Sequence, residues 1–150
     1  MTELHVTAER LVGTPAEHVY RCIADFHTHH PRFLPPAFSD FRVEEGGLGA
    51  GTVTSFRVTA GGRSRAYRMR VDEPEPGRVL TESDTQSSLV TRFTVTPEGP
   101  GCRVRIDTRW QGAGGVGGFF ERLFAPRVLQ RIYADELDRL DRYARDTLRR

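Results

Sequence analysis

Three histidines lie close together at His27, His29 and His30, with Asp25 just before them. Neutral imidazole can act as a general base or bind a metal ion. A zinc site takes ligands that converge from well-separated positions, usually with cysteine or carboxylate among them, whereas spacings of two and three residues scatter these rings around a helical segment. The pattern therefore favours a solvated helix end and no metal site, with one histidine at a cavity entrance as the alternative.

Two acidic residues, Glu82 and Asp84, end a short apolar stretch, "RVLTESD", that has the length of a strand. Side chains alternate between the two faces of a strand, so two registers are possible. In the first, Val79, Thr81 and Ser83 point inward, and we favour this one. In the second, Leu80 and the two carboxylates point inward, where burial would raise their pKa and make them general acid/base candidates.

A glycine-rich stretch, "EEGGLGAGTV", has Gly46 and Gly51 at the spacing of a phosphate-binding loop. That loop needs a lysine and a hydroxyl directly after its second glycine, but Thr52 and Val53 stand there. A dinucleotide loop must also join a strand to a helix, and this stretch lies between two predicted strands. We interpret it as a hairpin loop that uses glycine for positive φ angles, with no cofactor.

Composition narrows the possible functions. The 150 residues suit one domain, 1–150, and the net charge of +2 is too balanced to favour nucleic acid as a partner. Every basic residue is arginine, which is typical of a GC-rich, bacterial coding bias. No apolar run approaches a membrane span and no signal peptide is recognisable, so we expect a cytoplasmic protein. Cys22 and Cys102 are expected to be small buried hydrophobes.

Hydrophobic periodicity predicts a first strand, then a helix-rich segment, then a series of strands. Residues 3–12 alternate as a strand, and "TPAEHVYRCIADF" places Val19, Tyr20, Ile23 and Phe26 at helical spacing. A second short helix or turn ends at Pro35 and Pro36. Further strands are expected over residues 38–45, 52–59, 65–72, 78–83, 89–96 and 102–110. Their period-2 pattern is typical of an antiparallel sheet with one solvated face.

The last apolar segment should cover the dry face of this sheet. Its apolar stripe consists of Phe120, Leu123, Phe124, Val128, Ile132, Leu137, Leu140 and Tyr143. This spacing predicts a long C-terminal helix, which Pro126 should kink or split.

The order of these features resembles the START-like or SRPBCC superfamily, which includes birch-pollen-allergen-like proteins, lipid-transfer domains and polyketide cyclases. The resemblance rests on "TPAEHVYRCIADF", "GGLGAGT", "VDEPEPGRVLTESD" and the helix after "GAGGVGG". It implies an α+β helix-grip fold: a seven-stranded antiparallel curved sheet wrapped around a long C-terminal helix, with two short helices between strands 1 and 2. An apolar cavity would lie between them.

The predicted dry faces supply the expected ligand-binding residues. They are Phe26, Phe33, Phe56, Val58, Tyr67, Met69, Leu89, Thr91, Phe93, Thr108, Trp110, Phe120, Phe124, Val128 and Ile132. The resemblance further implies that two glycine segments gate the cavity, namely Gly46, Gly47, Gly49 and Gly51 together with Gly114, Gly115, Gly117 and Gly118.

Two functions fit these features. The first is binding or transport of a hydrophobic small molecule, such as a lipid, polyketide or isoprenoid, by a monomer or homodimer without stable membrane insertion. The second resembles a polyketide cyclase or aromatase acting in the same cavity. A cyclase needs a positioned acid or base, and the favoured register offers hardly any. The sequence therefore favours a carrier over an enzyme.

Overall fold

The structure, a computed structural model, describes residues 2–112 and 126–149. Its strands are β1 (Thr2–Val12), β2 (Phe38–Glu45), β3 (Val53–Ala60), β4 (Arg63–Glu75), β5 (Val79–Asp84), β6 (Val90–Glu98) and β7 (Gly101–Gly112). Its helices are α1 (Ala16–Ala24), the 3-10 helix η1 (His30–Phe33) and α3 (Pro126–Leu148). Phe120, Phe124 and the glycines at 114, 115, 117 and 118 lie outside the described residues.

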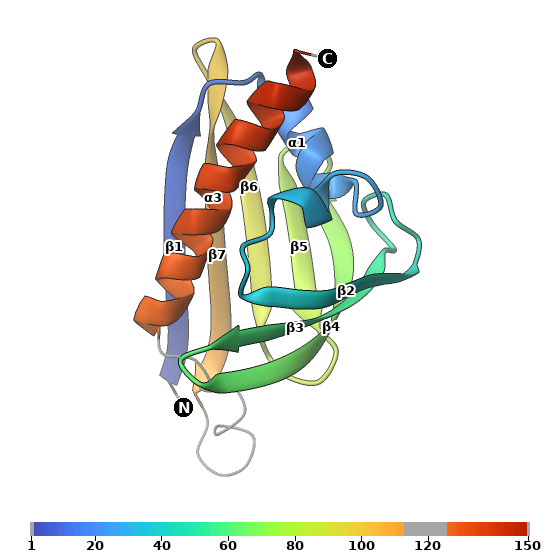
Figure 1. The fold of residues 1–150 in the computed structure, drawn as a ribbon, viewed down its shortest axis with the longest axis vertical. Helices are drawn as coiled ribbons and strands as arrows, with labels where there is room; N and C mark the ends of the chain where they lie inside the picture. Colours follow the sequence, from blue (N-terminus) through green and yellow to red (C-terminus); the bar gives the residue numbers. More distant parts are fainter. Residues whose placement is uncertain (1, 113–125, 150) are drawn as a thin grey trace.

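The seven strands form one antiparallel sheet in the order β1-β7-β6-β5-β4-β3-β2. The sheet curls so that β2 and β3 approach the side on which α3 lies (Figure 1). The dry face carries the core, which includes Val6, Phe93, Val104 and Ile106. The helix-grip fold predicted from the sequence is confirmed, with α1 and the single turn of η1 as the two short helices between β1 and β2.

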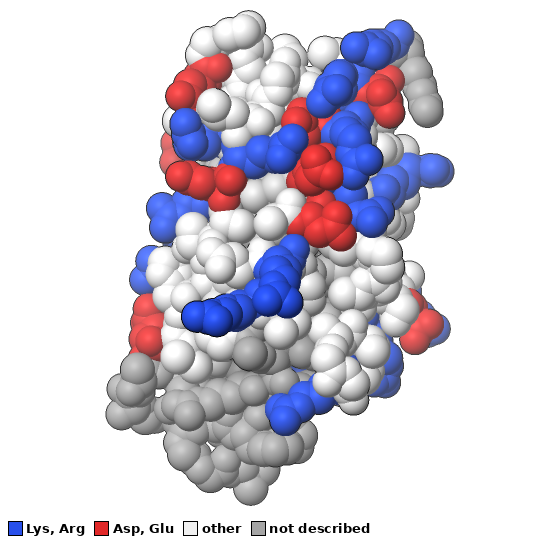
Figure 2. All heavy atoms as spheres, turned by 60° about the vertical axis from the view of Figure 1, so that its left-hand side comes forward, with Lys and Arg blue, Asp and Glu red and all other residues white. Residues whose placement is uncertain are grey.

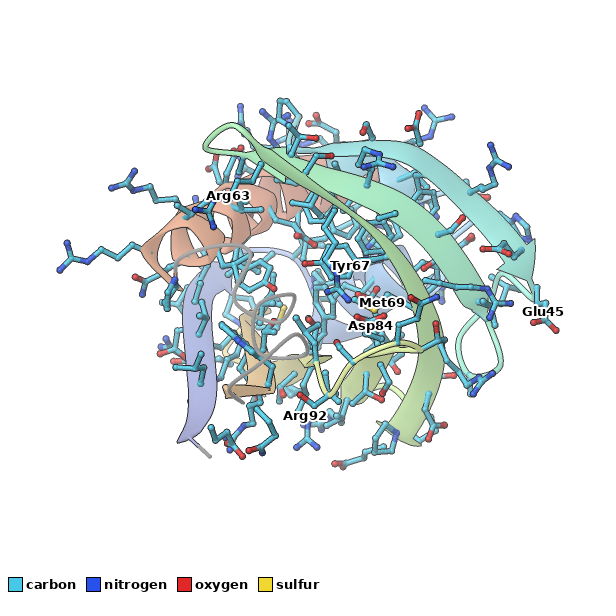
Figure 3. The ribbon with its side chains drawn as sticks, turned by 90° about the horizontal axis from the view of Figure 1, so that it is seen from below. Glu45, Arg63, Tyr67, Met69, Asp84 and Arg92 are labelled. Carbon is cyan, nitrogen blue, oxygen red and sulfur yellow. The ribbon has the colours of Figure 1, made fainter. Side chains whose placement is uncertain are left out.

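The two faces of the sheet differ as the period-2 pattern predicts. Tyr67, Met69 and Asp84 point into the space between the sheet and α3, whereas Glu45 and Arg92 lie on the outside (Figure 3). On α3, acidic and basic side chains alternate in ion pairs four residues apart, such as Arg139 with Asp135. The surface of the molecule around α3 therefore carries charges of both signs (Figure 2). No helix in the described ranges is long and apolar enough to cross a membrane.

The glycine-rich loop between β2 and β3 is tied to the end of α1. The amide of Phe26 donates to the Gly47 carbonyl at 2.8 Å, and the amide of Gly49 donates to the Ala24 carbonyl at 2.9 Å. Gly47 and Gly49 have φ angles of 141° and 59°, which favour glycine. The loop joins two strands, as the sequence predicts, and it satisfies one of the carbonyls that the last turn of a helix leaves without a partner.

The C-terminal helix is described from Pro126 onward. Proline suits the first position of a helix, which needs no amide hydrogen. The predicted kink or split at Pro126 involves residues 113–125, which lie outside the described residues, so it stays a prediction. The buried face of α3 consists of Leu129, Tyr133, Glu136, Leu137, Leu140, Asp141 and Ala144. Val128 and Tyr143, two members of the predicted stripe, are only partly buried.

The register of β5 is the second of the two possibilities, so the favoured one is wrong. Leu80, Glu82 and Asp84 are buried and lie on the face that carries the core. The cause is strand pairing: Glu82 lies between Val71 of β4 and Thr91 of β6, and directly paired residues share a face. Since Val71 and Thr91 point inward, Glu82 must do so too.

Candidate active site

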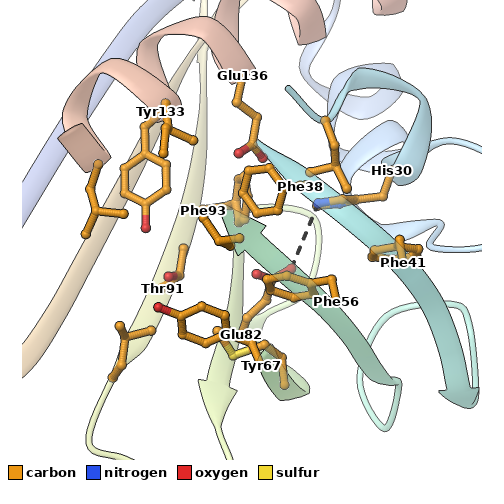
Figure 4. Close-up of a pocket in the computed structure, with 16 residues that line it drawn as sticks. His30, Phe38, Phe41, Phe56, Tyr67, Glu82, Thr91, Phe93, Tyr133 and Glu136 are labelled. Carbon is orange, nitrogen blue, oxygen red and sulfur yellow. Dashed lines mark ion pairs between the residues drawn. The ribbon is translucent and has the colours of Figure 1, made fainter. Parts of the chain in front are cut away.

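A cavity of about 50 Å³ lies between the concave face of the sheet and α3. It has room for a few water molecules and must widen to admit a larger ligand. The cavity is enclosed by η1 and the residue after it, by strands β2 to β6, and by α3 (Figure 4). Its walls are formed by His30, Leu34, Phe38, Phe41, Phe56, Val58, Tyr67, Met69, Glu82, Leu89, Thr91, Phe93, Leu129, Ile132, Tyr133 and Glu136. Most of this lining is apolar, and six of its members are aromatic rings of Phe or Tyr.

The structure places many of the predicted ligand-binding residues on this wall. They are Phe56, Val58, Tyr67, Met69, Leu89, Thr91, Phe93 and Ile132. Phe26 and Phe33 lie one layer behind it, with their rings 4.5 and 4.7 Å from that of His30. Thr108 and Trp110 are buried on the same face of β7 but do not line the cavity, and neither does Val128. Direct contact of the lining residues with a ligand stays a prediction.

His30 is a buried wall residue and not part of a solvated helix end, which corrects the interpretation favoured from the sequence. Its Nδ1 lies 2.7 Å from the carbonyl oxygen of Ile23. A carbonyl oxygen can only accept, so Nδ1 carries the proton and Nε2 is left with a lone pair. Burial lowers the pKa of His30 to about 4. The side chain is therefore a neutral imidazole whose basic nitrogen lies on the side of Glu82.

Glu82 occupies the opposite wall, with Oε1 at 3.9 Å from Nε2 of His30. Burial raises the pKa of this carboxyl to about 7, because removing water disfavours the charged form. Around pH 6 the pair consists of a neutral acid and a neutral base. The dashed line in Figure 4 marks this contact, which joins η1 to β5 across the cavity.

Glu136 is a third ionisable wall residue, and the sequence pattern did not identify it. It lies on the buried face of α3, and Figure 4 shows its carboxyl directed into the cavity. Burial, followed by the charges of Glu82 and Asp135, raises its pKa well above the usual value. Its spacing from Tyr133 (three residues) and Leu140 (four residues) places it on the buried face of the helix. The predicted stripe omits it because that stripe consists of apolar residues alone.

A chain of hydroxyls closes the cavity beside β7. The Tyr133 hydroxyl lies 2.6 Å from Oγ1 of Thr108, which lies 2.8 Å from Oγ1 of Thr91. These bonds fix the ring of Tyr133 against the sheet. Because every member has a partner within the protein, this chain orients the wall, whereas His30 Nε2 and the two carboxyls remain available to a ligand.

The other two histidines have separate partners. Nε2 of His27 contacts the Gly46 carbonyl at 2.9 Å, and Nδ1 of His29 contacts the Tyr143 hydroxyl at 2.7 Å. The three rings do not converge, and within the described ranges no group of three His, Cys, Asp or Glu could hold a metal ion. The glycines at 46, 47, 49 and 51 do not line the cavity, and their role as a gate stays a prediction.

The chain is similar to known proteins over nearly its whole length. A family model described as polyketide cyclase/dehydrase and lipid transport matches residues 3–145. The NMR structure of the KanY protein is 36% identical, with a TM-score of 0.84 over 97% of this chain and 99% of that one. A search of curated proteins gave no match.

Two more distant structures share the fold. A protein from Thermus thermophilus is 20% identical, with a TM-score of 0.77 over 96% of this chain and 99% of that chain. The Zhui aromatase/cyclase from a Streptomyces species is 18% identical, with a TM-score of 0.74 over 98% and 96% of the respective chains.

The family description covers cyclisation or dehydration on one side and lipid transport on the other. Both kinds of function use a hydrophobic small molecule, in agreement with the largely apolar wall. The family match spans nearly the whole chain, and the order of elements is that of the helix-grip fold. The protein therefore belongs to the polyketide cyclase/dehydrase and lipid-transport family of the START-like superfamily.

Proposed function

We propose that this protein is an enzyme of the cyclase or dehydratase type, which uses acid–base catalysis on a hydrophobic carbonyl compound. The observation that carries this proposal is the pair of His30 and Glu82, a neutral base and a neutral acid 3.9 Å apart on the wall of an apolar cavity. A carrier has no need of such a pair, because burying polar groups without hydrogen bonds costs stability. The sequence favours a carrier because the predicted inward faces of the strands offer hardly any acid or base, and the register of β5 is part of that prediction.

The two groups have complementary tasks. Nε2 of His30 takes a proton from the carbon next to a ligand carbonyl, while the Glu82 carboxyl donates its proton to the carbonyl oxygen, which gives an enol. The enol carbon can then attack a second carbonyl carbon of the same ligand, and the new carbon–carbon bond closes a ring. In that step the protonated His30 gives its proton to the new alkoxide oxygen, and the enol hydroxyl returns its proton to Glu82. Loss of water from the resulting alcohol completes a dehydration. No oxidant or reductant is required.

The protonation states set a pH window for this chemistry. Below a pH of about 4, His30 is protonated and cannot accept a proton. Above a pH of about 7, Glu82 is ionised and cannot donate one. We expect a bell-shaped pH profile of kcat/KM, with its maximum between these values.

The elementary step can be tested with a simple ketone, 4-phenyl-2-butanone, as the probe. In D2O the protein should accelerate exchange of the α-hydrogens for deuterium, which NMR follows. His30→Ala and Glu82→Gln should each lower the accelerated rate about a hundredfold or more, while NMR titration shows little change in affinity for the ketone. His27→Ala is the matched control, because His27 is exposed and absent from the cavity wall, and it should exchange at the wild-type rate.

The apolar majority of the lining favours one alternative, a carrier of a hydrophobic ligand. A carrier predicts that the protein leaves the exchange rate at its solvent value. It also predicts that Phe56→Ala or Leu89→Ala weakens binding, since both side chains contribute apolar area to the wall. Exchange that is accelerated equally by wild type and His30→Ala would contradict the enzymatic proposal.

A further inference from the structure

Glu136 is a buried carboxyl that the proposed reaction does not use. Its residue is 3% exposed, and within the described ranges its carboxyl has no hydrogen-bond or ion-pair partner. Buried polar groups in native proteins nearly always have partners, so each exception requires an explanation. Figure 4 shows this carboxyl directed into the cavity from α3. Either water or a ligand in the cavity can therefore supply the partner that the protein does not.

Among the described residues, the wall of the cavity has acidic groups but no permanent cation. Glu82 and Glu136 both line it. The other ionisable residues that residues 2–112 and 126–149 contribute are His30, Tyr67 and Tyr133, of which His30 is neutral. The nearby guanidinium of Arg65 is not on the wall. It is held 2.7 Å from Asp84 and stacks 4.3 Å above the ring of Tyr67. An anionic ligand would meet two carboxyls and no counter-charge, whereas a cationic ligand would supply one.

The rest of the wall also suits a cation with an apolar body. Aromatic rings attract cations to their faces, and the attraction is stronger where water is excluded. The rings that line the cavity are those of Phe38, Phe41, Phe56, Tyr67, Phe93 and Tyr133. Phe56 is stacked with Tyr67 at a centroid distance of 5.6 Å, so these side chains form a continuous surface opposite α3.

From these features we infer that the ligand carries a protonated amine, which binds to the carboxyl of Glu136, on an aromatic or otherwise apolar body held by the ring-lined wall. This inference rests on the proposed function, in that it assigns a substrate class to the same cavity. Glu136 is then a specificity-determining residue, and His30 and Glu82 act on the carbonyl part of the same molecule. A carboxylate ligand would gain no ion pair from the described residues of the wall, so we expect it to bind less tightly than the amine.

Binding of such a cation should release a proton. Without ligand, burial favours the protonated form of Glu136 by raising its pKa, and an ammonium group beside it favours the ionised carboxylate. Glu82 faces Glu136 across the cavity, and Asp135 is the charged neighbour on α3. Both disfavour ionisation of Glu136 until the cation arrives. Tyr67 and Tyr133 have pKa values raised by burial and stay neutral, and His30 is neutral above pH 4.

Three probes with one ring and three charges test the inference: phenethylamine, 2-phenylethanol and phenylacetate. At pH 6.5, calorimetry on the wild-type protein should give an affinity for the amine at least tenfold above that for the alcohol, and phenylacetate should bind less tightly than the amine. Calorimetry in buffers of different ionisation enthalpy should show release of about one proton with the amine and none with the alcohol.

Glu136→Gln keeps the shape of the side chain and removes its charge. It should weaken amine binding tenfold or more and abolish proton release, while its affinity for the alcohol is unchanged. Glu75→Gln, at an exposed position, is the matched control and should bind as the wild type does. Equal affinities for amine and alcohol, tighter binding of phenylacetate, no binding of any probe, or unchanged amine binding by Glu136→Gln would each overturn the inference.

The failure of this inference is separate from failure of the proposed function. If the amine preference is absent but His30→Ala still abolishes α-hydrogen exchange in the ketone, only the assignment of the ligand is wrong. If the amine preference is present and exchange is not accelerated, the cavity binds a cationic ligand and the acid–base reaction is wrong.

Discussion

Arg65→Ala is expected to lower the free energy of unfolding by about 3–5 kcal/mol, the usual cost of removing one partner from a buried ion pair. The guanidinium Nη2 lies 2.7 Å from Oδ2 of Asp84, whose side chain is 1% exposed. Loss of the arginine leaves a buried carboxylate whose remaining partners, the Ser87 hydroxyl and the Gln86 amide, carry no charge. Urea denaturation followed by circular dichroism at pH 7 measures the effect.

The double variant Arg65→Met with Asp84→Leu provides the control. Replacing both partners by apolar residues removes the desolvation cost along with the attraction, so this protein should be closer in stability to the wild type than Arg65→Ala is. If both variants lose the same free energy, the loss comes from packing and not from the unpaired charge. In that case the cation–π contact of Arg65 with Tyr67, at 4.3 Å, is the first candidate.

Glu82→Gln is expected to have the opposite effect on stability and to raise the free energy of unfolding at pH 8 by on the order of 1–3 kcal/mol. The pKa of Glu82 is about 7 in the folded protein, compared with an ordinary value of 4.5. Between these values the unfolded chain releases the proton and the folded protein keeps it. As pH rises between these two pKa values, the wild-type protein therefore loses stability. Glutamine cannot ionise, so the variant does not lose this stability.

The pH dependence identifies the cause of the stabilisation. Wild type and Glu82→Gln should differ least below pH 4.5, where the carboxyl is protonated in both states, and most above pH 7. His30 has the reverse sign: its folded pKa of about 4 is below its ordinary 6.5, so it destabilises the fold as pH falls through that range. Denaturation curves from pH 4 to 8 measure both. A gain from Glu82→Gln that is equal at every pH would contradict this account.

Together with the exchange experiment, this prediction means that one residue should lower stability and supply activity. Such a conflict is common at functional sites, where a group is held in an environment that does not suit it. If replacement of Glu82 by glutamine changes neither stability nor exchange, both parts of this account are wrong.

The fold was predictable because its elements have strong periodic patterns. Alternation in β6 and β7 placed Phe93 and Ile106 on the core face, where they are buried. In β5 the alternation was ambiguous, since Val79 and Leu80 are equally apolar, and polar Glu82 inside contradicts the rule that charged residues stay at the surface. The pairing of Glu82 with Val71 and Thr91 decides its direction, and pairing is a property of the sheet as a whole.

The candidate site was less predictable for the same reason. Its polar members, His30, Glu82 and Glu136, occupy positions where an apolar pattern predicts apolar residues. The spacing of the three histidines favours a solvated helix end, because it scatters their rings around the segment. The structure separates them by their partners: His30 reaches the Ile23 carbonyl, whereas His27 reaches the glycine-rich loop. Such long-range partners have no local signature.

The hydrogen bond between His30 and the Ile23 carbonyl should make the rate of the proposed reaction sensitive to temperature. Ile23 lies in the last turn of α1, where carbonyls lack partners within the helix, so the imidazole caps this helix and, in the proposed reaction, is also the base. Helix ends fray well below the temperature of global unfolding. When that turn opens, the bond that keeps the proton on Nδ1 at 2.7 Å is lost, and the two tautomers of the ring become interchangeable. We therefore expect the rate to pass its optimum several degrees below Tm, with recovery on cooling.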